Sequence, residues 1–434
     1  MPPLALFGGA PLRSLPFPQC NTIGAEEKRA VMAVLDSGVL SKFLGVWHSD
    51  FYGGPRVREA ERLYAERFQA RYAVTVNSAT TALQVALAAT GIEPGDEVIV
   101  SPYTMSASAS VILMQQAIPV FADVEPDYFC LDPVSIRRCI TPQTRAILVP
   151  HIFGLPADMA EILTIAREHH LRVIEDAAQS IGATWRGRFA GVLGDAGVLS
   201  LNYHKIIHSG EGGILLTQNE PIAKRAQLAR NHGEVVVDDW PDWPEISNTL
   251  GSNFRMTEIE AAIAAAQLAK LDFLLEHRRR LAARLTQRLS GVPALQPPAI
   301  RPDCTHSWYV YALRFFPEIA GVPRELFCQA LAAEGIPCGQ GYVKPLYLQR
   351  LYQQRIAYGK SGAPWTSNHY RGQVSYERGI CPVTENLHFS ELIAGDYCAY
   401  PLTERDVDDI ADGFLKVVEA LPQLRGRALH AVGS

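Results

Sequence analysis

Three short stretches of the sequence place polar, reactive side chains directly after apolar runs that are typical of β-strands. Lys205 follows "AGVLSLNY" and precedes the glycine-rich "SGEGG", and Asp176 ends "RVIED", with Gln179 three residues further on. In the third stretch, "VTVNSATTAL", a strand is expected to end at Asn77 and a helix to open with small and hydroxyl residues. Ligands on open α/β sheets bind beyond the carboxyl ends of the strands, so these groups are candidates for one shared site.

Each stretch offers a different chemical function. The start of the helix at residues 78–81 presents free backbone N–H groups and the positive end of the helix dipole, which favour a phosphate. A carboxylate buried at a strand end, such as Asp176, needs a cationic or donor partner, and a protonated heterocyclic nitrogen is one. Lys205 supplies an amine where a strand leaves the core.

An ordinary structural interpretation exists for each stretch taken alone. Ser78 could cap its own helix, Asp176 could cap the next one, and a single lysine is by default a solvated surface charge. Together, however, a phosphate cradle, a carboxylate for a ring nitrogen and a reactive amine are the three groups that pyridoxal 5′-phosphate (PLP) requires of a protein. The combination indicates a PLP enzyme.

The elements that must position these residues follow from the pattern along the chain. From about residue 60 to 215, helical stretches alternate with apolar runs, which predicts an α/β fold with a mostly parallel sheet covered on both faces. Residues 256–285 are expected to form one long helix, and the proline-rich stretch at 290–304 a linker. We therefore expect a large domain over 1–285 and a small α/β domain over 286–434. A loop at about 352–390 is interpreted either as a lid or binding loop, or as a flexible segment.

Composition narrows the class of protein. Forty basic and forty-five acidic side chains give a net charge of −5 with no long run of either sign, so a nucleic-acid partner is not expected. No apolar run approaches the ~20 residues of a membrane span, and the N-terminal stretch is unlike a secretory signal, so we expect a cytoplasmic protein. The eight cysteines form no CxxC pair, which argues against a metal site and against a disulfide framework.

The order and spacing of the motifs resemble the DegT/DnrJ/StrS family of sugar aminotransferases, which are PLP enzymes of fold type I. The motifs include "NSATTALQVAL", "HIFGLPADM", "EDAAQSIGA", "GDAGVLSLNYHKIIHSGEGG", "NFRMTEIEAAI" and "GYVKPLY", and they span roughly residues 25–405. The resemblance implies a mostly parallel seven-stranded sheet between helices, a smaller C-terminal α/β domain, and a homodimer with composite active sites.

The resemblance also implies a role for each site residue. Lys205 joins the cofactor covalently and then serves as the base and acid of a 1,3-proton shift. Asp176 keeps the pyridine nitrogen protonated, and Gln179 hydrogen-bonds the phenolic oxygen of the ring. The residues that hold the phosphate are Ser78, Ala79, Thr80 and Ser200, with Asn253 reaching it from the partner subunit. For Asn253, capping of its own helix is the alternative.

Two features depart from the usual pattern of the family. Where an aromatic residue usually lies over the cofactor ring this chain has Met105, whose thioether can also pack on a π-face, and Tyr103 is the alternative. The loop at 352–390 is longer than in the nucleotide-sugar enzymes. With "CPVTEN", it is more similar to the branch that acts on cyclitol ketones.

The expected reaction is transfer of an amino group from glutamate or glutamine to a keto-sugar. The acceptor is either nucleotide-linked or a cyclitol ketone such as an inosose, in amino-sugar, polysaccharide or antibiotic biosynthesis. A PLP-dependent sugar dehydratase is an alternative, but Lys205 argues against it because that group carries histidine at this position. A non-catalytic regulatory protein of the same fold is another, and the joint presence of Lys205, Asp176 and Gln179 argues against it.

Overall fold

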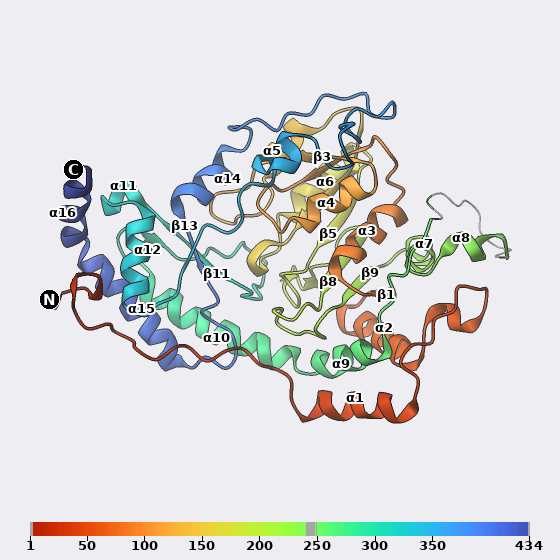
Figure 1. Ribbon diagram of the computed structural model, residues 1–434, viewed down its shortest axis with the longest axis horizontal. Coiled ribbons are helices and arrows are strands. Elements are labelled where there is room, and N and C mark those ends of the chain that lie inside the picture. The colour runs from red at the N-terminus through yellow and green to blue at the C-terminus, as the bar shows by residue number, and fades with distance from the viewer. Residues whose placement is uncertain (1–2, 240–247, 249, 433–434) are drawn as a thin grey trace.

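The computed structural model describes residues 3–239, 248 and 250–432. Residues 1–2 of the expected large domain and residues 433–434 of the expected small domain therefore lie outside the described residues. Seven strands form the central sheet in the order β1-β9-β8-β5-β4-β2-β3 (Figure 1). Their bounds are β1 Tyr72–Val76, β2 Glu97–Val100, β3 Ile118–Phe121, β4 Thr144–Pro150, β5 Arg172–Asp176, β8 Ala196–Ser200 and β9 Gly213–Thr217. Strands β3, β2, β4, β5 and β8 pair in parallel, whereas β9 is antiparallel to β8 and β1. The prediction of an α/β fold with a mostly parallel seven-stranded sheet is confirmed.

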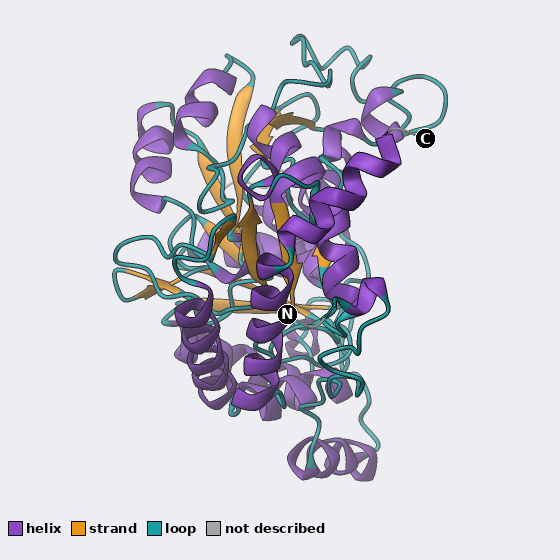
Figure 2. Cartoon of the chain, turned by 90° about the vertical axis from the view of Figure 1, so that its left-hand side faces the viewer, coloured by secondary structure: helices purple, strands orange, loops and turns teal. Residues whose placement is uncertain are grey.

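Helices cover both faces of this sheet, as Figure 2 shows. Three pack on one face: α3 Ala79–Ala89, α4 Ala107–Met114 and α7 Glu220–Arg230. The other face is covered by α2 Pro55–Phe68, α5 Pro133–Cys139, α6 Met159–Glu168 and α9 Glu258–Leu268. Outside these layers, α1 Ala25–Ser37 packs on α9, and the short elements β6 Thr184–Trp185, β7 Arg188–Phe189 and α8 Gly233–Val236 lie in connections. Burial of β2, β8 and β9 along their whole length explains why they appear in the sequence as continuous apolar runs.

The helix expected over 256–285 is in fact two helices, so that prediction was wrong. Helix α9 ends at Leu268, and α10 runs over Leu271–Leu289. Between them, Lys270 Nζ donates to Glu27 Oε2 (2.7 Å) and to Thr22 O (2.9 Å), and Gln267 Nε2 donates to Glu27 Oε1 (2.8 Å). We attribute the break to these contacts with the segment before α1, which periodicity along the helix does not reveal.

The C-terminal part of the chain forms a second core around an antiparallel sheet in the order β10-β11-β13-β12. Its elements are β10 Leu295–Gln296, β11 Tyr311–Phe315, α11 Pro317–Ala320, α12 Arg324–Ala333, β12 Gly339–Gln340, β13 Leu392–Gly395, α15 Glu404–Glu419 and α16 Leu421–Val432. The second half of α10 and Leu4, near the N-terminus, belong to this core, while the first half of α10 packs against the large sheet. A single helix therefore joins the two cores, and the division at residue 285 stays a prediction.

Residues 352–381 lie against the β3 edge of the large sheet, between α13 Arg350–Gln353 and α14 Pro382–Asn386. Tyr376 holds the segment there: its hydroxyl accepts from Trp365 Nε1 (2.9 Å) and donates to Pro119 O (2.8 Å). Phe121, at the end of β3, packs edge-on against the rings of Tyr352 and Tyr376. This segment covers an edge strand, which would otherwise present unpaired backbone groups and apolar side chains to water.

Candidate active site

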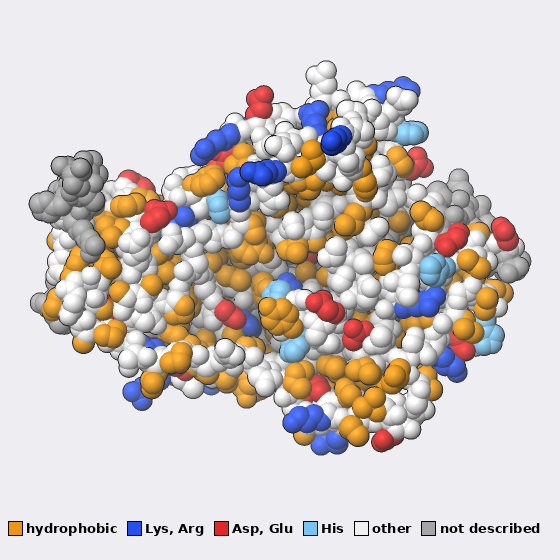
Figure 3. Space-filling view, viewed as in Figure 1, with side chains coloured by type: hydrophobic (Ala, Val, Ile, Leu, Met, Phe, Trp, Pro, Cys, Tyr) orange, Lys and Arg blue, Asp and Glu red, His pale blue; other side chains and the backbone are white. Residues whose placement is uncertain are grey.

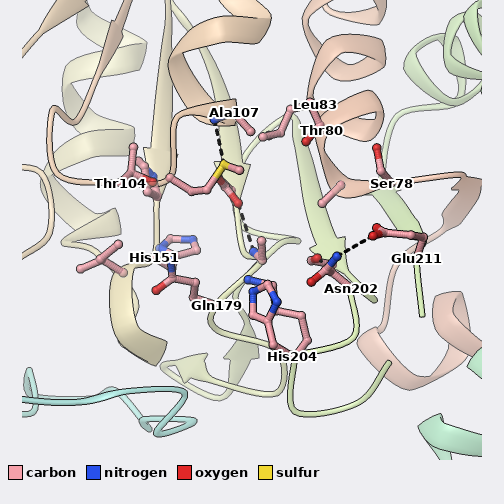
Figure 4. A pocket seen from close by; sticks show the side chains of 18 residues that line it. Ser78, Thr80, Leu83, Thr104, Ala107, His151, Gln179, Asn202, His204 and Glu211 are labelled. Atoms are coloured by element: carbon pink, nitrogen blue, oxygen red, sulfur yellow. Dashed lines mark hydrogen bonds between the residues drawn. The ribbon is translucent and has the colours of Figure 1, made fainter. Parts of the chain in front are cut away.

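One cavity of about 150 Å³ lies at the carboxyl ends of β4, β5 and β8, beside the starts of α3 and α4. Figure 4 shows the 18 side chains that line it, several of them directed toward its centre. Eight of the nine site residues predicted from the sequence are among them: Ser78, Ala79, Thr80, Met105, Asp176, Gln179, Ser200 and Lys205. The strand ends thus bring together residues that are more than 120 positions apart in the chain.

The start of α3 is a capped helix end and also has the free donors of a phosphate-binding site. Ser78 is the N-cap, because its Oγ accepts from Thr81 N (3.1 Å). The first intrahelical hydrogen bond runs from Ala82 N to Ser78 O (3.0 Å), so the N–H groups of Ala79 and Thr80 have no acceptor within the helix. A Cβ on Gly213 would lie 2.3 Å from Ser78 O, which explains the glycine where β9 passes behind the cradle. These free donors, at the positive end of a helix, fit a phosphate group.

Asp176 is buried and held from two sides. Its Oδ2 accepts from Ser108 Oγ (2.7 Å) on α4, and its Oδ1 accepts from Ala178 N (3.1 Å). Thr104 Oγ1 lies 3.0 Å from Ser108 Oγ and extends the chain of hydroxyls. The alternative interpretation, that Asp176 caps a following helix, was wrong, because a turn and not a helix follows β5; Asp176 binds the backbone of that turn and lines the cavity with a carboxylate of fixed orientation.

The side-chain amide of Gln179 has a defined orientation. Its Oε1 accepts from Phe153 N (2.9 Å), so its nitrogen must be the atom that donates to Tyr342 OH (2.8 Å). An amide nitrogen carries two hydrogens, and one remains for an acceptor in the cavity. This geometry suits a donor to a phenolic oxygen.

Lys205 is partly buried and lines the cavity, rather than being a solvated surface charge. Burial lowers the pKa of its ammonium group to about 8, against an opposing effect of the Asp176 carboxylate. Its Nζ lies 3.5 Å from Tyr309 OH and 4.5 Å from the centre of the Tyr309 ring. At pH 7 roughly a tenth of this amine is therefore neutral, far more than for an unperturbed lysine, as nucleophilic chemistry requires.

The two candidates for stacking on a ring differ in position. Met105 lines the cavity, about half of its surface is exposed, and its Sδ accepts from Ala107 N (3.0 Å), a contact drawn in Figure 4. Tyr103 is fully buried, and its hydroxyl accepts from Tyr342 N (3.0 Å). Because Tyr103 is not among the lining residues, Met105 is the better placed of the two.

Asn253 is the predicted residue that does not line the cavity of its own chain. It is exposed, and Thr257 rather than Asn253 is the N-cap of α9, so the capping interpretation was wrong. The neighbouring Phe254 O accepts from Asn77 N (2.9 Å), which places this segment beside the cradle of the same chain.

Several residues around the site are not predicted from the sequence. His151 Nδ1 accepts from Ala157 N (3.0 Å), so its Nε2 carries the hydrogen that points at Glu175 Oε2 (2.8 Å), and neither side chain is exposed. Tyr309 and Tyr342, from the C-terminal part of the chain, contact Lys205 and Gln179. The motifs "HIFG" and "GYVKPLY" contain two of these residues, but nothing in their local pattern assigns a role.

Two other kinds of site are absent from the described residues. Within residues 3–239, 248 and 250–432, no cluster of three or more His, Cys, Asp or Glu side chains could hold a metal ion. Over the same residues, no helix is long and apolar enough to cross a membrane.

Comparison with known proteins assigns the family. The sequence model of the DegT/DnrJ/EryC1/StrS aminotransferase family matches residues 21–385. The chain belongs to this family of aminotransferases. PLP dependence follows from that membership, and the cavity described above has the donors and the lysine that this cofactor needs.

Three similar proteins of this aminotransferase family illustrate its range. The spore coat polysaccharide biosynthesis protein SpsC of Bacillus subtilis is 34% identical over 81% of this chain and 89% of its own. The L-glutamine:2-deoxy-scyllo-inosose aminotransferase of Streptomyces fradiae is 35% identical over 96% of this chain and 97% of its own. The crystal structure of DesI in the presence of its TDP-sugar product superposes with a TM-score of 0.78 at 28% identity, covering 99% of this chain and 98% of that one.

Proposed function

We propose that this aminotransferase binds PLP in the cavity at the strand ends and transfers an amino group from glutamine to the ketone of a cyclitol. A keto-sugar linked to a nucleotide is the second candidate acceptor. The observation that carries the proposal is the meeting of Lys205 Nζ, the Asp176 carboxylate and the free N–H groups of α3 in one cavity.

Each residue has a defined task in this proposal. PLP, when bound, supplies a protonated ring that withdraws electrons from the carbon attached to the transferred nitrogen. Asp176 accepts the hydrogen of the ring nitrogen, Gln179 donates to the phenolic oxygen, and Ala79 and Thr80 bind the phosphate, together with Ser78 and Ser200. Met105 packs on the ring. Lys205 holds the cofactor and then moves a proton between the two carbons of the exchange.

The choice of acceptor rests on the identity and coverage of the relatives taken together. The inosose aminotransferase is 35% identical over 96% of this chain, whereas DesI, whose product is a TDP-sugar, covers 99% at 28% identity, and the polysaccharide protein covers 81% at 34% identity. The glutamine donor is taken from the name of the inosose aminotransferase. We therefore favour a cyclitol ketone and glutamine over a nucleotide-linked sugar and glutamate.

A two-step assay tests the function. The protein is first incubated with glutamine or glutamate, and loss of visible absorbance reports amination of the cofactor. Cyclitol ketones and nucleotide-linked keto-sugars are then added separately, and the product is analysed for nitrogen by mass spectrometry. We expect an inosose to restore the absorbance and to gain an amino group. Absorbance that cycles without nitrogen in the product would favour the dehydratase alternative instead.

We also propose a homodimer in which Asn253 binds the phosphate in the partner's cavity. Several large apolar side chains on α1 and in the segment between α1 and α2 are exposed, a usual sign of an interface: Met32, Leu35, Val39, Leu40, Leu44, Val46 and Trp47. In Figure 3 hydrophobic side chains gather over the region of α1 and α9, at the lower edge of the view. A second copy of the chain is the occupant that completes the site.

Subunit mixing tests the shared site. Lys205→Ala and Asn253→Ala are each expected to be inactive, and the two are unfolded and refolded together. In a shared-site dimer each hybrid has one site with both lesions and one with neither, so random pairing restores roughly a quarter of the wild-type activity. If hybrids form without any activity, Asn253 acts within its own chain.

A further inference from the structure

A tightly held segment in the C-terminal part of the chain places Tyr309 against Lys205, which lines the cavity. The backbone on both sides of it is anchored to the large sheet's connections: Ser307 N donates to Gly154 O (2.9 Å) and Val310 N donates to Phe153 O (3.2 Å). Trp308, directly before Tyr309, is buried and has a left-handed backbone with φ of 56°. A bulky residue adopts that conformation only where the surroundings impose it.

A buried arginine fixes the same segment from a third direction. Arg278 on α10 donates from Nη1 to Trp308 O (2.8 Å) and to Tyr309 O (3.4 Å), and the same nitrogen pairs with Asp396 Oδ1 (3.0 Å). Because α10 joins the two cores, this contact ties the position of Tyr309 to both of them. The direction of the Tyr309 side chain is therefore set by packing and not by local loop geometry.

The end of this side chain meets the reactive amine. Lys205 Nζ lies 3.5 Å from the Tyr309 hydroxyl oxygen and 4.5 Å from the ring centre. The hydroxyl accepts a hydrogen bond from the ammonium form of Lys205 and donates one to the amine form, whereas the ring face attracts only the ammonium form. Burial raises the pKa of the Tyr309 hydroxyl, so it stays protonated while Lys205 titrates.

We propose that Tyr309 is a positioning residue of the transfer reaction, which holds the ε-amino group of Lys205 in the cavity and helps to set its charge. This inference rests on the proposed function of Lys205. Neither the position of Tyr309 in the sequence nor its local pattern indicates such a role. Its hydroxyl supplies a polar partner to the partly buried amine, and without it the ammonium form loses that partner.

Other charged and titratable groups around the pair do not change when the hydroxyl is removed. Those that face Lys205 or Tyr309 are Asp176, Tyr203, His204, Glu211, Arg278, Tyr342 and Asp396. Asp176 favours the ammonium form of Lys205 and lies on β5, away from Tyr309's own segment. Burial and the neighbouring Lys205 both lower the pKa of His204. These influences are common to the wild type and the Tyr309→Phe variant. A difference in the pKa of Lys205 between the two proteins therefore reports the effect of the hydroxyl.

The test is a pH titration of Lys205 in the full-length chain freed of PLP. Wild type and Tyr309→Phe are pulsed with an amine-acylating reagent across the pH range 6 to 10, and labelling of the Lys205 peptide is measured by mass spectrometry. The hydroxyl binds both forms of Lys205, but its hydrogen bond to the charged form is the stronger one, so its loss corresponds to a downward shift of about one pH unit in the pKa of Lys205. From a wild-type pKa of about 8, such a shift makes labelling at pH 7 roughly fivefold faster.

Tyr311→Phe is the matched control. Tyr311 lies two residues after Tyr309, and its hydroxyl is hydrogen-bonded to Thr286 Oγ1 (2.9 Å). We expect this variant to titrate as the wild type does. A Tyr309→Phe midpoint equal to that of the control, or shifted upward, overturns the inference. Borohydride mapping of the PLP-loaded wild type is run in parallel. If it marks another lysine, the proposed function fails, while the titration still reports whether Tyr309 acts on Lys205.

Discussion

The two sides of the cavity are built in different ways. On one side, the phosphate cradle, Asp176 and Lys205 follow strands of the large sheet or open a helix after one, so backbone geometry alone places them near each other. On the other side, Tyr309 and Tyr342 arrive from the C-terminal part of the chain and contact the side chains of Lys205 and Gln179. The first side can bind the cofactor directly, and the second adjusts the residues that do.

This difference predicts a ranking of effects. Residues that contact the cofactor at the point where charge develops contribute most to the rate, because electrostatic contacts made in the transition state usually lower the barrier more than any other interaction. A neutral hydroxyl acting through another side chain contributes about as much as one ordinary hydrogen bond. Tyrosines from the same C-terminal part of the chain that do not reach the cavity should affect stability alone.

Asp176→Asn is expected to have the largest effect. The amide cannot hold a proton on the ring nitrogen as a carboxylate does, so the half-reaction with glutamine should slow by roughly 10²-fold or more. Stopped-flow absorbance measures this rate. PLP should still attach to Lys205 in the variant, and Asp272→Asn, an exposed carboxylate paired with Arg67, should behave as wild type. An unchanged half-reaction would mean that Asp176 only caps the turn at Ala178.

Tyr376→Phe should destabilise the folded protein without slowing the reaction. Its hydroxyl joins Trp365 Nε1 and Pro119 O in a buried position, and both lose a partner in the variant. We expect the free energy of unfolding in urea to fall by about 1–3 kcal/mol, with kcat/KM unchanged. Tyr358→Phe, in the more exposed part of the same segment, should lose less. Unchanged stability with a loss of kcat would instead support a lid function for residues 352–390.

Of the three substitutions, Tyr342→Phe should have the smallest effect, when rate changes are compared with unfolding as free energies. Gln179 keeps its contact with Phe153 N but loses the hydroxyl that receives its amide hydrogen, so its orientation is less restricted. Loss of one neutral hydrogen bond corresponds to a rate decrease of about two- to tenfold. Single-turnover kinetics with glutamine measures it, with Tyr311→Phe as the control. A decrease as large as that of Asp176→Asn would show that the two sides of the cavity do not differ in the way described.

The same difference explains which residues the sequence could predict. Ser78, Asp176 and Lys205 lie where an apolar run meets a polar or glycine-rich turn. This pattern is local and can be recognised in the sequence without any knowledge of tertiary contacts. The parallel order of the strands follows from their alternation with helices.

Other features depend on contacts between distant segments. Tyr309 reaches Lys205 because Arg278, on α10, holds its backbone, and the break between α9 and α10 coincides with contacts of Lys270 to Glu27. The sequence predicts a lid, a binding loop or a flexible segment at about 352–390, because a loop's packing on an edge strand leaves no periodic pattern in its sequence. In each case the cause lies far away in the chain, so local patterns do not reveal it.

The most direct test of the account is chemical mapping of the cofactor lysine. The protein loaded with PLP is reduced with borohydride, digested, and its peptides are analysed by mass spectrometry for the mass of the reduced cofactor. We predict that the label is found on Lys205 and is absent from the Lys205→Ala variant. A label on any other lysine, or none after addition of PLP, would contradict the assignment of the strand-end cavity as the catalytic site.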